Sequence, residues 1–304
     1  MQSAHAVLII AGPTASGKSR LAIDAARAFN GVVLNCDALQ IYKDIPIIAA
    51  TPNEEEKALA EHRLFEIYDA GKRGNVVEWL DLCVAEIHRL WHEQKLPIVV
   101  GGTGMYIDAL INGVTPIPEV PTQIRQHVAT LSLPELYAFL QQNDAVMAQR
   151  LHPNDKTRLT RAVEIMLFTK RKLSDWYQVP LIKKLPEAQF RVVKIVPSIE
   201  VIEQRCRKRL DKMISAGVLA EISALLNRGI DETLPAMKAL GVPELSLAVK
   251  GQMPLNEALE LAKLHTRQYA KRQRTWLKNK LQADLEFAEP YSGQSAWLEK
   301  IRNL

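Results

Sequence analysis

The chain has 304 residues, of which 47% are hydrophobic and 24% charged. This composition excludes a disordered or fibrous protein and predicts a folded one with a sizeable core. The net charge of +5 is mild, so the position of the positive charge along the chain matters more than its total.

The cysteines and the N-terminal residues indicate the cellular compartment in which the protein is expected. Cys36, Cys83 and Cys206 are odd in number, far apart and never in a C-x-x-C pair, which argues against a disulfide framework and a zinc knuckle. Met1 to His5 run directly into an apolar segment without a basic leader, and no apolar run approaches the length of a membrane span. We therefore expect a cytoplasmic protein with no membrane contact.

A glycine-rich loop follows the first expected strand. It fits the pattern G-x-x-x-x-G-K-[ST] at every fixed position, and its residues are Gly12, Pro13, Thr14, Ala15, Ser16, Gly17, Lys18 and Ser19. The apolar run Ala6–Ala11 predicts a buried parallel strand before the loop, and Arg20–Arg27 has helical apolar spacing after it. This order is typical of a phosphate-binding loop. The alternative is a glycine turn before an ordinary helix.

The residue types of the loop suit a diphosphate or triphosphate. Gly12 and Gly17 let successive backbone N–H groups turn inward at the positive end of the helix. Lys18 adds a full positive charge, and Ser19 offers a hydroxyl to a Mg²⁺ ion on the same phosphates. We expect Mg²⁺ as cofactor, with Ser19 as its protein ligand.

An acidic residue ends the second expected strand, Gly31–Asp37. In open parallel sheets the carboxyl ends of the strands face the ligand, so Asp37 is expected near the phosphate loop. Residues 38–42 form a turn, and the proline-interrupted run Ile45–Pro52 is predicted to be a packed loop. Asn53 has the features of a helix cap, with three glutamates behind it.

The next segments return to the sheet. Val76–Gln94 has helical spacing, Leu96–Val100 predicts a strand, and Gly101–Gly104 forms a second glycine turn at the ligand edge. A helix from Met105 to about Ile111 follows. The proline-rich stretch Thr115–Pro121 is typical of a domain boundary.

Beyond this joint, residues 122–185 show helical patterns and no convincing strand, whereas Phe190–Val196 predicts a strand that rejoins the sheet. The remainder is predicted to be helical, over 200–216, 219–227 and 255–281.

The fold class is therefore α/β, a P-loop-type parallel sheet core flanked by helices, with an inserted all-helical domain. The expected domains are residues 1–114 as the first part of the core, 115–189 as a helical insertion contacting nucleic acid, and 190–304 as the completion of the core.

Two sequence motifs are absent, and their absence limits the reactions that the chain is expected to catalyse. A typical nucleoside triphosphatase has a second acidic residue after an apolar strand, but the strand ending at Val100 runs into glycine. The guanine signature N-K-x-D is absent, because Asn279-Lys280 is followed by Leu281-Gln282. This favours transfer chemistry on a small substrate over a triphosphate-driven switch.

Two basic segments suggest a nucleic-acid partner. Between Leu261 and Lys280 there is no acidic residue, aromatic Tyr269 and Trp276 are interleaved, and the cations are Lys263, Arg267, Lys271, Arg272, Arg274, Lys278 and Lys280. The insertion carries a second cluster, made of Arg150, Lys156, Arg158, Arg161, Lys170, Arg171 and Lys172. The alternative is a basic surface helix without a ligand. His88 and His92 have metal-ligand spacing but no third ligand, so we interpret them as solvated.

Several motifs together resemble the tRNA dimethylallyltransferase family, also called isopentenyl-tRNA transferases. They run in the family order over nearly the whole chain: Gly12 to Ser19, Asp37 to Tyr42, Gly101 to Tyr106, Arg150 to Asp155 and Thr266 to Trp276. Two places depart from the family pattern. Ala38 replaces the usual serine, and Ile48-Ala49-Ala50-Thr51 replaces a Gly-Thr-Ala-Lys run.

The resemblance implies transfer of a dimethylallyl group from dimethylallyl diphosphate to the exocyclic amine of the adenosine next to the anticodon in tRNA. Lys18, the loop amides and Mg²⁺ would neutralise the charge of the leaving diphosphate. Arg209, which matches a family position facing the diphosphate, would add positive charge. Asp37 would take the proton of the weakly nucleophilic amine, and Thr103 would orient that amine. The residues expected to contact tRNA are Asp37, Ala38, Leu39, Gln40, Thr103, Arg125, Arg158, Arg161, Arg267, Lys271 and Arg274.

Two other functions stay open at this point. A kinase of a small metabolite would use Asp37 to take a proton from a hydroxyl, and an RNA-binding protein without activity would not need Lys18. We expect a monomer; the sequence does not indicate which tRNAs are preferred, whether the product is modified further, or whether the loop also binds nucleoside triphosphates.

Overall fold

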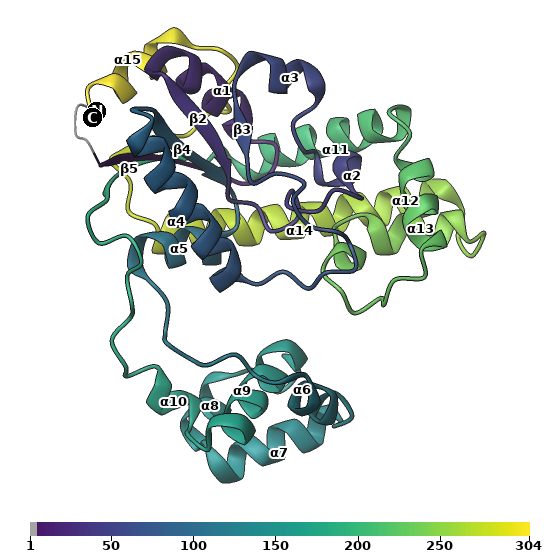
Figure 1. Cartoon of the computed structure of the whole chain (residues 1–304). Coiled ribbons are helices and arrows are strands. Elements are labelled where there is room, and N and C mark those ends of the chain that lie inside the picture. The colour runs from purple at the N-terminus through teal and green to yellow at the C-terminus, as the bar shows by residue number, and fades with distance from the viewer. Residues whose placement is uncertain (1–4) are drawn as a thin grey trace. The chain divides into compact units, whose positions relative to one another are not determined.

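The computed structural model describes residues 5–304. Its centre is a parallel sheet with the strand order β3-β2-β4-β1-β5-β6 (Figure 1). The strands are β1 (Ala6–Ala11), β2 (Gly31–Asn35), β3 (His62–Arg63), β4 (Leu96–Gly101), β5 (Gln189–Ile195) and β6 (Leu285–Phe287). Their parallel pairing brings every carboxyl end to one edge of the sheet.

Apolar strands form the middle of this sheet because helices cover both faces. All six residues of β1 are buried. Leu8 and Ile10 of β1 share a core with Leu21 and Ala22, and on the other face the Trp79 indole donates to Asn35 O at 2.9 Å. Strands buried on both faces appear in a sequence as continuous apolar runs, which is why the sequence predicts them well.

The helices of the sheet-containing part are α1 (Lys18–Phe29), α2 (Pro46–Ala49), α3 (Glu54–Leu59), α4 (Val76–His92), α5 (Gly104–Asn112), α11 (Ile199–Ser215), α12 (Val218–Asn227), α13 (Val242–Val249), α14 (Leu255–Lys280) and α15 (Ser295–Arg302), with a short 3₁₀ helix η1 (Ala236–Lys238). Helix α1 packs against β2 and β4, while α4 and α5 lie across the sheet from it (Figure 1). As predicted, Asn53 caps α3, accepting from Glu56 N at 2.8 Å.

The prediction of a loop at Ile45–Pro52 is wrong, because α2 forms a helical turn within it. Pro46 stands at its first position, and the Glu221 carboxylate accepts hydrogen bonds from Ile47 N at 2.7 Å and Ile48 N at 2.9 Å. A distant acidic side chain thus satisfies amides that a four-residue helix leaves unpaired. Sequence spacing gives no sign of this partner.

The expectation that everything after β5 is helical is also wrong. Strand β6 pairs with β5 at Val193, and the Asp284 carboxylate accepts from Val192 N at 2.7 Å just before the pairing begins. A three-residue edge strand carries too little alternation to be recognised in sequence.

The chain divides into two compact units, one comprising the chain up to Ile111 with Lys184–Leu304, and the other Asn112–Lys183. The second unit overlaps the predicted insertion 115–189 and contains only helices, namely α6 (Thr122–Ala129), α7 (Leu133–Asn143), α8 (Ala145–Arg150), α9 (Lys156–Thr169) and α10 (Leu173–Trp176). It has its own apolar core, which includes Val128, Leu136, Leu140 and Leu159.

The two ends of this second unit are joined to each other. Val114 N donates to Ile182 O at 3.1 Å, and Ile182 N donates to Val114 O at 2.9 Å. The chain therefore enters and leaves the unit through neighbouring residues. Within residues 5–304, no helix combines the length and apolarity required to cross a membrane.

Candidate active site

The phosphate loop lies at the carboxyl end of β1 and leads into α1. Its Gly12 N donates to Gly101 O at 3.2 Å, which joins the loop to the end of β4. Gly17 has a φ of 90°, and a methyl group there would lie 2.4 Å from Tyr291 O, so only glycine fits. The Arg205 guanidinium donates to Ala15 O at 2.7 Å and fixes that residue's positive φ of 62°.

Lys18 and Arg209 supply the positive charge of the pocket. Lys18 is only 8% exposed, and its ammonium donates to Pro13 O at 3.3 Å. Burial lowers the pKa of Lys18 to about 8, against a rise caused by Asp37, and the charge of Arg209 lowers it further. Arg209 donates to Thr14 Oγ1 at 3.3 Å and Ala49 O at 3.5 Å, and burial lowers its pKa as well.

Asp37 and Thr103 lie opposite this charge, at the ends of β2 and β4. Asp37 is fixed by its neighbours: its N–H donates to Asn35 Oδ1 at 2.8 Å, and its Oδ1 accepts from Leu39 N at 3.0 Å. The Thr103 hydroxyl accepts from Ala38 N at 3.1 Å, so it still has a proton to donate, and Tyr269 lies next to it. The two side chains thus come from adjacent strands at one edge of the sheet.

Lys18, Arg209 and Asp37 line one pocket, of which Thr103 is not a lining residue, and this pocket has an apolar part and a polar part. Its apolar lining includes Leu39, Ile48, Leu210, Met213 and Leu240. The polar lining comprises Thr14, Lys18, Ser19, Asp37, Gln40, Arg209, Thr266, Tyr269 and Gln273, with Ala49 and Cys206 completing the wall. Burial and then the charge of Asp37 raise the pKa of Tyr269 to about 12, so its hydroxyl stays neutral at physiological pH.

Most of the predicted pocket residues come together here. Thr14, Lys18, Ser19, Asp37, Leu39, Gln40 and Arg209 all line the same pocket. The Gln40 amide donates to Ala49 O at 3.2 Å and Ala50 O at 2.6 Å, which holds the wall formed by the variant segment Ile48–Thr51. The replacement of the family run therefore leaves that wall closed and makes it more apolar.

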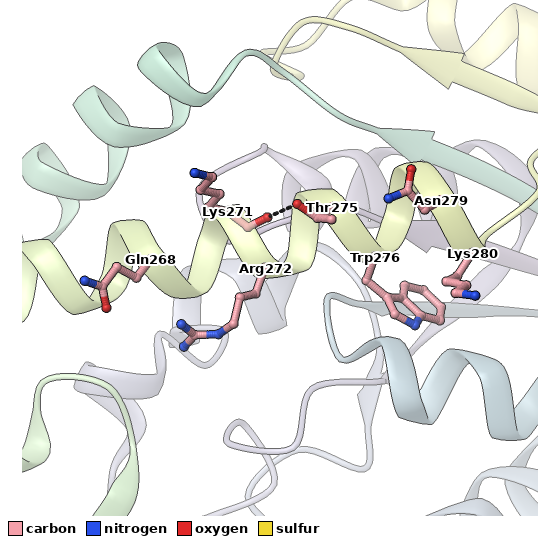
Figure 2. A pocket seen from close by; sticks show the side chains of 7 residues that line it. All are labelled: Gln268, Lys271, Arg272, Thr275, Trp276, Asn279 and Lys280. Carbon is pink, nitrogen blue, oxygen red and sulfur yellow. Dashed lines mark hydrogen bonds between the residues drawn. The ribbon is translucent and has the colours of Figure 1, made fainter. Parts of the chain in front are cut away.

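A second, open groove runs along α14 (Figure 2). It is lined by Gln268, Lys271, Arg272, Thr275, Trp276, Asn279 and Lys280. Trp276 packs close to Gly104, where an added methyl group would lie 2.4 Å from the indole. The groove therefore combines three cations with one flat aromatic side chain on a single helix.

The predicted tRNA-contacting cations differ in their present partners. Lys271 is exposed in the groove, whereas Arg267 pairs with Glu203 at 2.7 Å and Arg274 donates to Pro197 O at 2.8 Å. In the second unit, Arg125 donates to Val120 O at 3.0 Å, and the ion pairs Arg158–Asp155 and Arg161–Glu164 each measure 3.4 Å.

The sequence pattern places Tyr269 among the residues facing a nucleic acid and does not single out Gln273, but both project from α14 into the pocket. A signal existed. The buried positions of α14 are Ala258, Ala262, Ala270, Gln273 and Leu277, so Gln273 occupies a core position of the helix. A glutamine on the buried stripe needs hydrogen-bond partners inside the protein, and that requirement marks it as more than a surface residue.

The comparisons with known proteins agree with these motifs. A family model described as IPP transferase matches residues 40–280. The chain is 41% identical to the tRNA dimethylallyltransferase of Zymomonas mobilis over 90% of this chain and 88% of that protein, and 40% identical to that of Rhodospirillum rubrum over 93% and 88%.

Solved structures show the same similarity. The tRNA delta(2)-isopentenylpyrophosphate transferase of Staphylococcus epidermidis matches with a TM-score of 0.70 and 30% identity over 98% of this chain and 97% of that chain. A eukaryotic dimethylallyltransferase acting on tRNA matches with a TM-score of 0.77 and 29% identity over 90% and 69%.

Proposed function

The chain belongs to the IPP transferase family and is a tRNA dimethylallyltransferase, and we propose that its pocket holds dimethylallyl diphosphate while an adenosine of the tRNA enters beside Asp37 and Thr103. The observation that carries this proposal is the division of one pocket into a cationic side, an apolar wall and a carboxylate. An allylic diphosphate needs the first two, and an amine nucleophile needs the third. The small-metabolite kinase and the inactive RNA-binding protein do not fit these relatives.

The cationic side would receive the diphosphate. Lys18, Arg209 and the loop amides at the start of α1 neutralise the charge that develops as the allylic C–O bond breaks. Because Lys18 and Arg209 donate to neutral oxygens and form no ion pair within residues 5–304, their charges remain available to an anion. The hydrocarbon part would lie against Ile48, Met213 and Leu240.

The carboxylate side would receive the adenine. Its exocyclic nitrogen forms the new N–C bond and loses a proton, which Asp37 accepts, while the Thr103 hydroxyl donates to the base and holds it in line. The target base must leave its stack to reach Asp37, and the surrounding RNA then needs contacts elsewhere. We assign these contacts to the α14 groove around Lys271 and to Arg125, Arg158 and Arg161 of the helical unit.

Mg²⁺ fits this pocket only together with the substrate. Among residues 5–304 there is no group of three or more His, Cys, Asp or Glu side chains that could hold a metal ion, but the Ser19 hydroxyl lines the pocket on the diphosphate side. We propose that Ser19 and the diphosphate oxygens hold it together. When bound, Mg²⁺ neutralises charge on the leaving group.

The test is nucleoside analysis after incubation of the purified protein with Mg²⁺, dimethylallyl diphosphate and an unmodified anticodon stem-loop. We expect N6-isopentenyladenosine at the position next to the anticodon, and none in a transcript with guanosine there. Modification at another adenosine would overturn the assigned position, and absence of a prenylated nucleoside would overturn the donor. We also propose that the enzyme is cytoplasmic and acts as a monomer, and light scattering during turnover would test the monomeric state.

A further inference from the structure

Gln273 stands between the two sides of the pocket. It projects from α14, is only 6% exposed, and lies far in sequence from both groups that it touches. Its Oε1 accepts a hydrogen bond from Thr14 N at 2.9 Å, and its Nε2 donates to Gly102 O at 2.9 Å. One side-chain amide thus joins the phosphate loop to the glycine turn that carries Thr103.

The orientation of this amide is unambiguous. The Thr14 N–H can only donate and the Gly102 carbonyl can only accept, so the oxygen must face the loop and the nitrogen must face the turn. Replacing either atom by one of the wrong kind leaves a buried polar group without a partner, which is costly.

Close packing makes the connection rigid. A methyl group at Gly102 would lie 2.5 Å from Gln273 Nε2 and 2.7 Å from Gly12 O, so loop, turn and helix touch directly at this point. Tyr269, one helical turn before Gln273, lies close enough to Thr103 and Gln273 for both to lower the pKa of its hydroxyl. The amide therefore lies in a continuous set of contacts from Thr14 to Thr103.

We propose that Gln273 is a positioning residue that fixes the distance between the diphosphate and the attacking amine, a role that rests on the proposed function. Both polar atoms of its side chain are bonded within the protein, so it acts through Thr14 on the donor side and through Gly102 and Thr103 on the acceptor side. A displacement of about 1 Å between two reactants is enough to slow a reaction by about 10²-fold.

The first test compares Gln273→Met with Gln252→Met, a substitution of an exposed glutamine outside α14. A methionine side chain keeps about the volume of the glutamine but makes neither hydrogen bond, so we expect kcat to fall by about 10²-fold, with the KM of each substrate changed less than threefold. The Gln252 variant should behave as wild type. An unchanged kcat, or a loss confined to KM, would overturn the proposal.

The second test uses Gln273→Glu, which keeps the shape and makes residue 273 titratable. A protonated carboxyl can accept from Thr14 N and donate to Gly102 O, whereas a carboxylate faces the Gly102 carbonyl with no proton to donate. Lys18, Arg209, Asp37 and Tyr269 also face the pocket, but they are the same in both proteins. The ratio of variant to wild-type kcat should therefore rise as the pH falls from 8 to 5.5, and a constant ratio would contradict the role.

A third measurement does not depend on turnover. The amide of Thr14 should exchange its hydrogen at least tenfold faster in Gln273→Met, because it loses its acceptor. If the wild type forms no prenylated nucleoside, the proposed function fails, while slow exchange at Thr14 in the wild type and fast exchange in the variant would still support the connection. Equal exchange in both proteins would refute it.

Discussion

The cations of the pocket and the cations of the surface are held in different ways. Lys18 and Arg209 donate to a carbonyl or hydroxyl oxygen, and within residues 5–304 neither takes part in an ion pair. Arg267, Arg158 and Arg161 each pair with a carboxylate at the surface. The buried cations of the pocket have no carboxylate partner, which lowers the stability of the fold but leaves them able to bind an anionic ligand. The surface cations form weak, solvent-screened ion pairs, which a phosphate group could replace.

Substitutions in the pocket and at the surface should therefore differ in the size of their effects. Inside the pocket the charged groups act in a low-dielectric setting, so removing one of them should change rates by powers of ten. At the surface several cations share the work, so removing one should change binding by a small factor.

The largest effect should come from Asp37→Asn, which keeps the size of the side chain but cannot accept a proton. We expect prenyl transfer to fall by about two to four powers of ten, the usual scale for general-base catalysis, while tRNA binding stays within a few-fold. Single-turnover assays with both substrates bound will measure this. Undiminished transfer by the variant would remove Asp37 from the role of base.

Lys18→Met should lower the activity of the enzyme and raise the stability of its fold. Loss of the ammonium that faces the diphosphate should lower kcat by about 10²- to 10³-fold. The same change removes a charge whose burial lowers its pKa from 10.5 to about 8, a penalty of about 3 kcal/mol at neutral pH. Urea unfolding should show a variant more stable than the wild type, by up to that amount; a less stable variant would contradict the comparison of pocket and surface.

The surface should respond more mildly to loss of charge. Neutralising Arg267, Lys271 and Arg274 together should weaken tRNA binding and reduce its salt slope by at most about 2, since each contact to single-stranded RNA contributes about 0.7. Lys271→Ala alone should account for the largest share, because Arg267 is paired with Glu203 and Arg274 is bonded to Pro197 O. Lys300→Ala on α15 serves as control. Equal shares for the three cations would show that their present partners do not matter.

The smallest effect should be a pH dependence of donor binding. The folded, ligand-free protein holds Lys18 at a pKa of about 8, so its ammonium is lost as the pH rises through 8, long before it would be lost in the unfolded chain. The Kd for inorganic diphosphate should therefore increase by about tenfold between pH 7 and pH 9, measured by calorimetry. In Lys18→Met this increase should disappear. A wild-type Kd that is flat across this range would show that Lys18 keeps its proton.

The sequence predicts the parts of this molecule that are local. The phosphate loop, strands β1, β2, β4 and β5, and the placement of Asp37 all depend on runs of neighbouring residues, and the structure has them where expected. What the sequence does not reveal depends on distant partners. Helix α2 needs Glu221, β6 needs an edge of β5, and the role of Gln273 is visible only when Thr14 and Gly102 are beside it.

The paired hydrogen bonds between Val114 and Ile182 close the helical unit at its base. Because its two ends meet, the unit is an inserted domain with its own apolar core. Residues could therefore be inserted into this unit or lost from it while β4 and β5 keep their registers on β1.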